Sequence, residues 1–455
     1  MSIKGHVEIE LKDVNTGEVQ HIDGGNFVTN AITDFSKILP GSNTVAGVRD
    51  LPNQLLFPVA TNALGGLLIF ENSLSSDVTD YQFKPSVNNK LVAMAGSDSD
   101  ATHPNRGSYN GTESGATTTG FRSVWDFGTS QANGQISALA RTNVSFTDYP
   151  NMYLIGGQYY LTDAYIFDLA DSKIGIVFKY NETTQEMFAV NVKGTSVSGV
   201  YEAQVYKRRI PKFSYKVYEI PSTLGDIETV GEPFEIDLRS YSLEHGVDSI
   251  CSYRLDCSVD EDAGYLYVPF GPYAQNTTFK ILRVNLSTLA MDLLTVTNGF
   301  SFKYTNMTVS GGYIFAKERN STNLHIMNLS DLTDDTVITL QNVGDEVGIS
   351  VGSGAVLCGI SVNSSDYTNL YIVYSDGTKT KVGKEVTSGT DATVDNARKL
   401  PFTKLMRTSY ATGYTNPRLI PYITYLGTKY NLPTPVTKTA AQTMKIIYTL
   451  TDSGN

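Results

Sequence analysis

Ile281-Leu-Arg-Val-Asn-Leu-Ser-Thr-Leu289 is echoed further along the chain by Leu324-His-Ile-Met-Asn-Leu-Ser-Asp-Leu332. The asparagines of the two copies lie 43 residues apart. A repeat of about 40–50 residues that holds three or four strands is typical of a β-propeller blade. Such a sheet cannot bury both faces alone, so radial stacking of several blades covers the faces and leaves only short edges.

The surroundings of the repeat support this interpretation. An aromatic, apolar run precedes each copy, at residues 265–270 and 313–316, and a weaker third unit spans 355–358 and 370–374. At this spacing roughly six or seven blades fit into residues 121–401. A long β-sandwich and a β-helix are the competing architectures, but the short, strict coils of a β-helix are not visible.

Both ends of the chain alternate between apolar and polar residues, as half-buried strands do. Val7, Ile9 and Leu11 form one apolar face, and residues 444–450 form another. A turn at residues 15–17 makes the first strand part of a hairpin. We therefore expect the first and last strands to pair in one sheet, with the propeller inserted between them.

The sequence thus predicts an all-β protein of two domains. Residues 1–120 plus 402–455 would form a small β-rich domain, and 121–401 a β-propeller-like domain. One short helix is expected over 29–39, because apolar residues recur there at helical spacing and Pro40-Gly41 follows.

Shorter elements complete the prediction. Residues 67–70 and 91–94 are expected to be buried strands, and 97–120 an extended loop rich in Gly, Ser, Thr and Asn. A short helical turn is expected within 417–432, ended by prolines at 433 and 435.

Composition excludes several classes of protein. The 455 residues carry 35 basic and 46 acidic side chains, a net charge of −11, and only 18% of residues are charged. This acidic balance argues against nucleic acid as a partner, which requires a positive surface. No apolar run approaches the length of a membrane span, and the first residues lack a secretory signal pattern. Three cysteines without Cys-x-x-Cys spacing favour neither a disulfide framework nor a zinc site, although a Cys251–Cys257 bridge is geometrically possible.

Catalytic and cofactor motifs are not visible in the sequence, so we expect no enzyme activity, no cofactor and no bound metal. The acidic turn 260–262 lacks the ligand spacing of a calcium loop. Residues 374–378 read as an Asp-Gly hairpin turn. With 46 acidic residues, a carboxylate pair for glycan hydrolysis would not be detectable, and a glycan depolymerase stays an alternative.

Binding residues are expected in the loops between the second and third strands of each blade, which emerge on one face of a propeller. These loops contain Tyr273, Arg319 and Tyr367. Tyrosine and arginine favour binding because each offers a large contact area with a polar tip. The alternative is an ordinary polar rim.

A second candidate is the basic run that includes Lys207, Arg208 and Arg209. An anionic glycan would be its ligand. The alternative is a solvated hairpin without a ligand.

Four segments resemble virion appendage proteins of tailed phages that infect Gram-positive and gut anaerobic bacteria. They are residues 26–30, 106–115, 123–141 and 435–450, so the resemblance covers about 1–145 and 415–455. A resemblance at both ends, with none in the middle of the chain, suits a constant attachment domain that carries a variable display domain.

The resemblance implies a tail fibre or receptor-binding appendage that attaches through its terminal domain and presents a propeller to the host surface. Its partners would be other virion proteins and a host cell-surface glycan or protein, and it would form a symmetric homo-oligomer on the virion. A neck, collar or head appendage with a purely structural role is the alternative within the same class.

Overall fold

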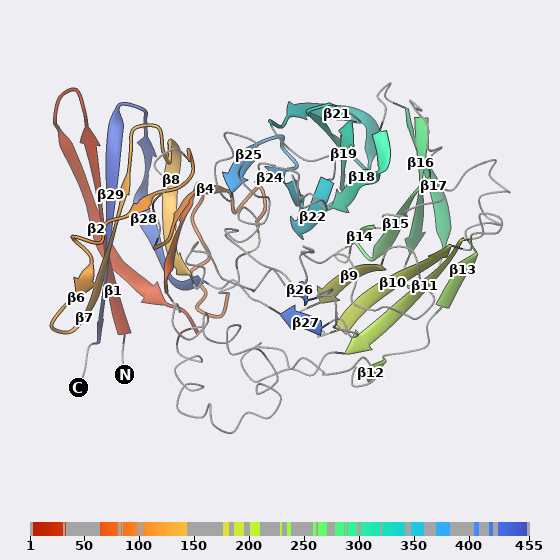
Figure 1. The fold of residues 1–455 in the computed structure, drawn as a ribbon, viewed down its shortest axis with the longest axis horizontal. Coiled ribbons are helices and arrows are strands. Elements are labelled where there is room, and N and C mark those ends of the chain that lie inside the picture. The colour runs from red at the N-terminus through yellow and green to blue at the C-terminus, as the bar shows by residue number, and fades with distance from the viewer. Residues whose placement is uncertain are drawn as a thin grey trace.

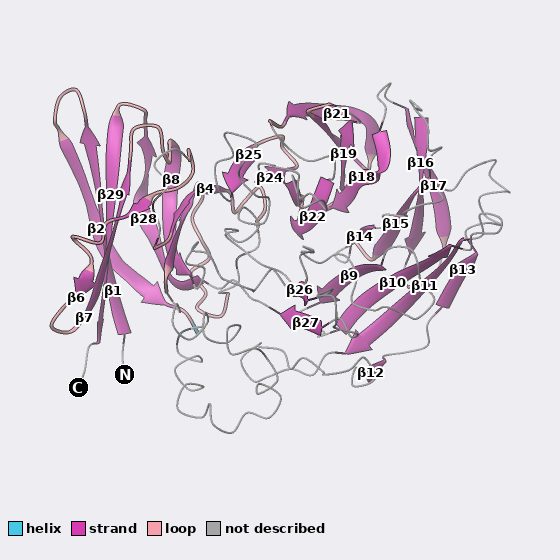
Figure 2. Cartoon of the chain, viewed as in Figure 1, coloured by secondary structure: helices cyan, strands magenta, loops and turns pink. Residues whose placement is uncertain are grey.

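We analysed a computed structural model of the chain. The described residues are 3–30, 32, 64–80, 83, 85–97, 99, 103–142, 176–181, 186–194, 201–209, 228–229, 234–237, 258–260, 263–270, 278–285, 287–288, 290–297, 302–318, 321–341, 347–358, 370–382, 405–408, 418–421 and 426–452. They are almost entirely strands and their connections (Figure 2). The all-β, propeller-like fold class predicted above is confirmed.

The two ends of the chain build one ten-stranded sheet, which lies at one side of the molecule (Figure 1). Its order is β4-β3-β8-β28-β2-β1-β29-β7-β5, with β6 also paired to β7. The strands are β1 (Ile3–Asp13), β2 (Val19–Val28), β3 (Gly66–Phe70), β4 (Leu91–Ala95), β5 (Ser108–Tyr109), β6 (Gly115–Ala116), β7 (Gly120–Phe127), β8 (Gly134–Thr142), β28 (Leu426–Lys438) and β29 (Gln442–Asp452).

The predicted pairing of the first and last strands is confirmed. β1 and β29 are antiparallel over their whole length, from Ile3 opposite Asp452 to Asp13 opposite Gln442. The predicted hairpin is also present, since β1 pairs with β2 through the turn at Gly17, whose φ is +76°. Asp13 fixes this turn by accepting the amide hydrogens of Asn15 and Thr16.

This ten-stranded sheet folds over on itself, and we call the result the terminal sandwich. Met94 of β4 forms a parallel bridge with Arg106, just before β5, so the two ends of the strand order meet. The apolar faces enclose a single core. Its largest side chain is the sole tryptophan, Trp125, which is fully buried and donates its indole N–H to the carbonyl of Gly96.

A buried cation adjoins this core. The guanidinium of Arg141 lies 4.7 Å from the centre of the Trp125 ring and 5.2 Å from that of Tyr448. It donates to the carbonyls of Leu64 and Gly66 and to the Ser123 hydroxyl. Burial lowers the pKa of Arg141 to about 10, so the guanidinium stays charged at neutral pH.

Two sequence predictions about this region need correction. The terminal domain does not end at residue 120, because β7 pairs with β29 and β8 pairs with both β28 and β3. Where the structure describes the range 417–432, in which a helical turn was expected, it has strands instead: β27 (Arg418–Pro421) and the first part of β28. β28 continues through both prolines by a bulge between Asn431 and Val436. Of the predicted helix 29–39, Asn30 and Ile32 are helical and Thr29 is not, while residues 31 and 33–39 lie outside the described residues.

Between the two halves of the sandwich the chain forms three four-stranded antiparallel sheets, which we call blades A, B and C (Figure 1). Blade A is β14 (Ser258–Asp260), β15 (Tyr265–Phe270), β16 (Thr278–Asn285) and β17 (Met291–Thr297). Blade B is β18 (Phe302–Ser310), β19 (Tyr313–Glu318), β20 (Asn323–Asn328) and β21 (Asp331–Thr339). Blade C is β22 (Val347–Gly352), β23 (Ala355–Cys358), β24 (Leu370–Tyr374) and β25 (Lys379–Val382).

Other strands surround these blades. A five-stranded sheet contains β9 (Ile176–Asn181), β10 (Glu186–Gly194), β11 (Tyr201–Arg209), β12 (Glu228–Thr229) and β13 (Phe234–Asp237). β26 (Leu405–Thr408) pairs with β27. The predicted count of six or seven blades includes segments outside the described residues.

The sequence repeat marks the turn between the third and fourth strands of a blade. The side-chain oxygen of Asn285 accepts the amide hydrogens of Ser287 and Thr288 in blade A, each at 2.9 Å. Asn328 accepts the amide and hydroxyl hydrogens of Ser330 in blade B. In both blades the repeated asparagine therefore makes local hydrogen bonds that fix the turn.

Blade B buries both of its faces, as a propeller blade must. Ile314 and Met327 pack in one core cluster with residues of blade A, whereas Phe315 and Ile326 pack in another with residues of blade C. The turns of blades B and C also touch. A Cβ atom on Gly311, which has a φ of +57°, would lie 2.2 Å from the backbone nitrogen of Gly354.

Candidate functional site

The three loop residues expected to bind a ligand, Tyr273, Arg319 and Tyr367, lie outside the described residues. The order of strands places each of them where the sequence analysis assumed, between the second and third strands of blades A, B and C. Their use in binding therefore stays a prediction.

The basic run Lys207, Arg208 and Arg209 forms the end of β11. In the backbone register these residues face Phe188, Met187 and Glu186 of β10, and β12 pairs with the last two on the other side. The run is thus part of a strand inside a sheet, and its side chains are outside the described set. An anionic ligand here stays a prediction.

A site that the sequence did not single out lies where the terminal sandwich meets blade C. The amide of Leu91, the first residue of β4, donates to the hydroxyl of Tyr374 at 3.1 Å. The carbonyl of Leu91 accepts a hydrogen bond from the Thr380 hydroxyl at 2.7 Å. Tyr374 is fully buried, which raises the pKa of its hydroxyl to about 12.

An ion pair borders these hydrogen bonds. Lys90 donates to the carboxylate of Asp376, in the turn between β24 and β25, and its ammonium lies 5.9 Å from the centre of the Tyr374 ring. Thr378 donates its amide and its hydroxyl to the same carboxylate. Burial alone would raise the pKa of Asp376, but the hydrogen bonds from Lys90 and Thr378 outweigh it and lower that pKa below its ordinary value.

These contacts add to the hydrogen bonds along the outer edge of β4. The carbonyl of Val92 accepts from the side chain of Asn105, and Met94 bonds to Asn105 and Gly107 through its backbone. Leu91 is the remaining residue of this edge, and its partners come from blade C. Unpaired backbone groups on an edge strand invite pairing with another chain, so blade C protects the sandwich at this point.

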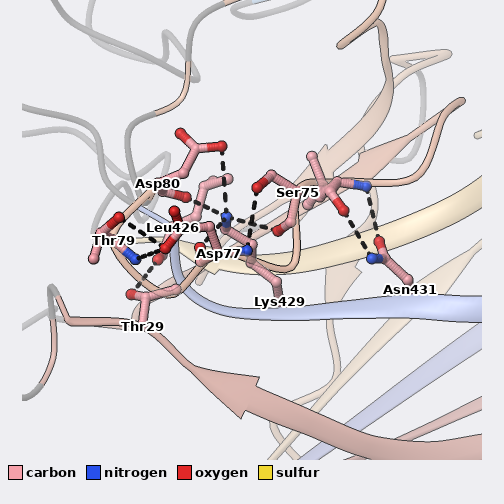
Figure 3. Close-up of polar contacts among 9 residues, drawn as sticks. Thr29, Ser75, Asp77, Thr79, Asp80, Leu426, Lys429 and Asn431 are labelled. Atoms are coloured by element: carbon pink, nitrogen blue, oxygen red, sulfur yellow. Dashed lines mark hydrogen bonds and ion pairs between the residues drawn. The ribbon is translucent and has the colours of Figure 1, made fainter.

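The segment that leads into β4 is fixed to the sandwich by a buried lysine (Figure 3). We call residues 71–80 and 85–90 the strap. The ammonium of Lys429 on β28 donates to the strap carbonyls of Ser75 at 3.0 Å and Asp77 at 3.3 Å, and also to the carbonyl of Asp80. Only 1% of the Lys429 side chain is exposed. Burial lowers its pKa, although the carboxylates of Asp80 and Asp77 act in the opposite direction.

Asn431, two residues further along β28, adds a second attachment. Its side chain accepts from the amide of Leu74 and donates to the carbonyl of the same residue, both at 2.8 Å (Figure 3). Near the start of β28, the Thr29 hydroxyl donates to the carbonyl of Leu426 at 2.7 Å. β28 therefore holds the strap through side chains that satisfy main-chain groups.

Together, the contacts of Lys90, Leu91 and Lys429 fix the strap on the terminal sandwich and blade C beside it. Within the described residues there is no group of three or more side chains suited to holding a metal ion. The same part of the chain contains no helix that is both long and apolar enough to cross a membrane. The sequence shows Lys429 and Asn431 alternating with Tyr430 and Leu432 at the start of β28, but the partners of the two polar residues are over 300 residues away in the chain.

Comparisons with known proteins give little further information. No protein-family model matches the chain, and a search of curated proteins also finds no match. Among solved structures, one match comes from "Structural and Mechanistic Analysis of Two Prolyl Endopeptidases: Role of Inter-Domain Dynamics in Catalysis and Specificity", with 11% identity and a TM-score of 0.28. The match covers 82% of this chain but only 57% of that one. A likeness this distant carries no argument about function.

Proposed function

We propose that this protein is a virion appendage of a tailed phage, a tail fibre or receptor-binding protein. It attaches through the terminal sandwich and presents the propeller-like domain to the host surface. Its partners are other virion proteins on one side and a cell-surface glycan or protein on the other. The protein acts by binding rather than by catalysis.

The observation that carries this proposal is a coincidence of boundaries. The segments that resemble phage appendage proteins, about 1–145 and 415–455, are nearly the same segments that pair in the terminal sandwich, which uses Ile3–Thr142 and Leu426–Asp452. A constant attachment domain should form one folded unit from the shared parts of the chain. The blades, which carry no resemblance, lie outside that unit.

The placement of the two chain ends also supports attachment by the sandwich and display by the blades. Both termini leave the sandwich at the same end, because β1 and β29 are antiparallel neighbours (Figure 1). The pairing of β1 with β29 uses no residue of the blades. This is a favourable design for displaying different binding domains on one support.

A competition assay tests the proposal. Purified full-length protein is added to host cells, and both its binding to the cells and the adsorption of phage are measured. We expect saturable binding and a dose-dependent fall in adsorption. Absence of both would contradict the receptor-binding role.

Variants locate the contact. The triple substitution Y273A/R319A/Y367A should weaken binding at least tenfold if the loops are the hot spot. K207A/R208A/R209A should weaken binding only if the ligand is an anionic glycan. K4A/K12A, which removes two exposed cations from the sandwich, is the matched control and should bind normally.

Two outcomes favour other functions. Labelled protein found near the phage head would indicate a neck, collar or head appendage with a structural role. Release of reducing sugars from host envelopes would indicate a depolymerase.

A further inference from the structure

The contact between the strap and blade C differs in strength from the contact between the strap and β28. We propose that residues 90–91 and blade C form a releasable latch, at which the propeller-like domain separates from the terminal sandwich while the strap stays on β28. This inference concerns movement between the domains and does not depend on the phage assignment.

The attachment to β28 is the stronger one. Lys429 is 1% exposed and donates to three main-chain carbonyls, and Asn431 pairs with both backbone groups of Leu74. Three of these hydrogen bonds are charge-assisted, and removal of the strap would break all five at once. The strap therefore belongs to the sandwich.

The attachment to blade C combines two buried but neutral hydrogen bonds at Leu91 with an ion pair that is partly in contact with water, and neutral hydrogen bonds are weaker than the charge-assisted ones of Lys429. Its ion pair has side-chain exposures of 15% for Lys90 and 41% for Asp376, so solvent and salt screen the attraction. Tyr374 and Thr380 add hydrogen bonds, both to Leu91. Water can replace each of these partners once the surfaces part.

Opening of the latch has a defined structural result. The backbone of Leu91 loses its cover, and the edge of β4 is then exposed at this one residue, because Val92 and Met94 keep their partners within the sandwich. The latch therefore opens without loss of the sandwich core. Local opening of this kind is reported by exchange of individual amide hydrogens.

The test measures amide exchange in the full-length chain. D376N removes the charge of the ion pair but leaves Tyr374, Thr380 and Leu91 unchanged, so faster exchange at Leu91 reports opening. We expect exchange of the Leu91 amide to rise about three- to fivefold, as loss of a partly exposed ion pair predicts. The Leu74 amide, held by Asn431, should be unaffected.

Three further variants make the result specific. K90M removes the other partner of the ion pair and leaves the turn at Asp376 intact, so it should speed exchange at Leu91 by a similar factor, and the double variant K90M/D376N should speed it no further. D292N removes the ion pair with Arg283 in blade A, which has comparable exposure at 30% and 49%, and should leave Leu91 unchanged.

The proposal is overturned if D376N leaves Leu91 exchange at the wild-type rate. It is also overturned if Leu74 accelerates by the same factor as Leu91, since the strap would then leave with the blade. Should D376N fold poorly, the unmodified chain in low and high salt gives the same comparison, because salt weakens the ion pair but not the buried Lys429 contacts.

Discussion

The terminal sandwich and the three blades are both built from antiparallel strands, but they are held together over very different distances in the chain. The sandwich joins Ile3 to Asp452 and Thr142 to Leu426. Each blade pairs strands that follow one another directly, such as β18 to β21. The sandwich therefore forms through pairing of strands that are far apart in the chain, whereas a blade forms through turns that join neighbouring strands.

The two regions also treat polar groups differently. The sandwich buries the cations Arg141, Lys429 and Lys438 and uses them to satisfy main-chain carbonyls or amide oxygens. Blade B also buries Lys317, which donates to the carbonyl of Ser321, and it pairs His325 with Asp335. The asparagine-fixed turns and the pair Arg283–Asp292, by contrast, are exposed. Buried contacts of this kind are expensive to break, while exposed ones contribute little.

The largest expected effect comes from Lys429→Met. The substitution keeps the length of the side chain but removes three charge-assisted hydrogen bonds to strap carbonyls, so the free energy of unfolding of the sandwich should fall by about 3–4 kcal/mol. Fluorescence of the sole tryptophan, Trp125, follows unfolding of the sandwich alone. The matched control Arg283→Met, at an exposed pair, should cost no more than about 1 kcal/mol. Equal losses would contradict the comparison.

A smaller effect is expected at the contact between two blades. Gly311→Ala combines a left-handed φ of +57° with a Cβ placed 2.2 Å from the Gly354 nitrogen, and should cost about 3 kcal/mol. Gly17→Ala in the sandwich has a similar φ of +76° but open space around it, and should cost about 1 kcal/mol. Amide exchange in blades B and C should accelerate for the first variant without a change in Trp125 fluorescence.

Asn328→Ala should have a still smaller and local effect. Loss of the hydrogen bonds to Ser330 should destabilise blade B by about 1 kcal/mol. Faster exchange is expected for β20 and β21 and not for β1 or β29. Asn285→Ala is the parallel test in blade A. If either substitution accelerated amide exchange outside its own blade as much as inside it, the turn-fixing role would be contradicted.

The smallest effect concerns acid stability of the sandwich. Lys445 donates to Glu113 at 2.5 Å and lowers the pKa of that carboxyl below its ordinary value of 4.5. A lowered pKa in the folded state stabilises the fold above pH 4.5, and this stabilisation is lost as the pH falls through the folded value. Since both side chains are about one third exposed, the contribution should stay below about 1 kcal/mol. Thermal midpoints of the wild type and Glu113→Gln should converge below pH 4 and differ at pH 6.

Local patterns predicted local structure well. The alternation at Val7, Ile9 and Leu11 predicted β1, and the repeated asparagine predicted the blades, because side-chain period and turn chemistry are properties of short segments. The pairing of β1 with β29 was also predictable, since two half-buried strands at the ends of a chain each need a partner.

The partners of other segments were not predictable in this way. Trp125 lies in a strand that reads equally well as part of a blade, and only its pairing with Ile446 assigns it to the sandwich. Lys429 reads as a surface lysine until the strap is placed over it. Asp376 was correctly identified as a turn residue, but its contact with Lys90 joins positions 286 residues apart. Non-local contacts of this kind depend on the whole fold.

The antiparallel pairing of Ile3 with Asp452 has a consequence for synthesis of the protein. During synthesis β1 and β2 leave the ribosome before the other strands, and β29 leaves it after them. β1 can therefore pair with β2 early, but its other neighbour, β29, exists only after the blades have been made. Each blade can form as soon as its own four strands have emerged. We therefore expect the nascent chain to mature from the middle outward, with the two ends closing the structure as its final step. A truncation near the C-terminus would then leave folded blades on a chain whose sandwich never forms.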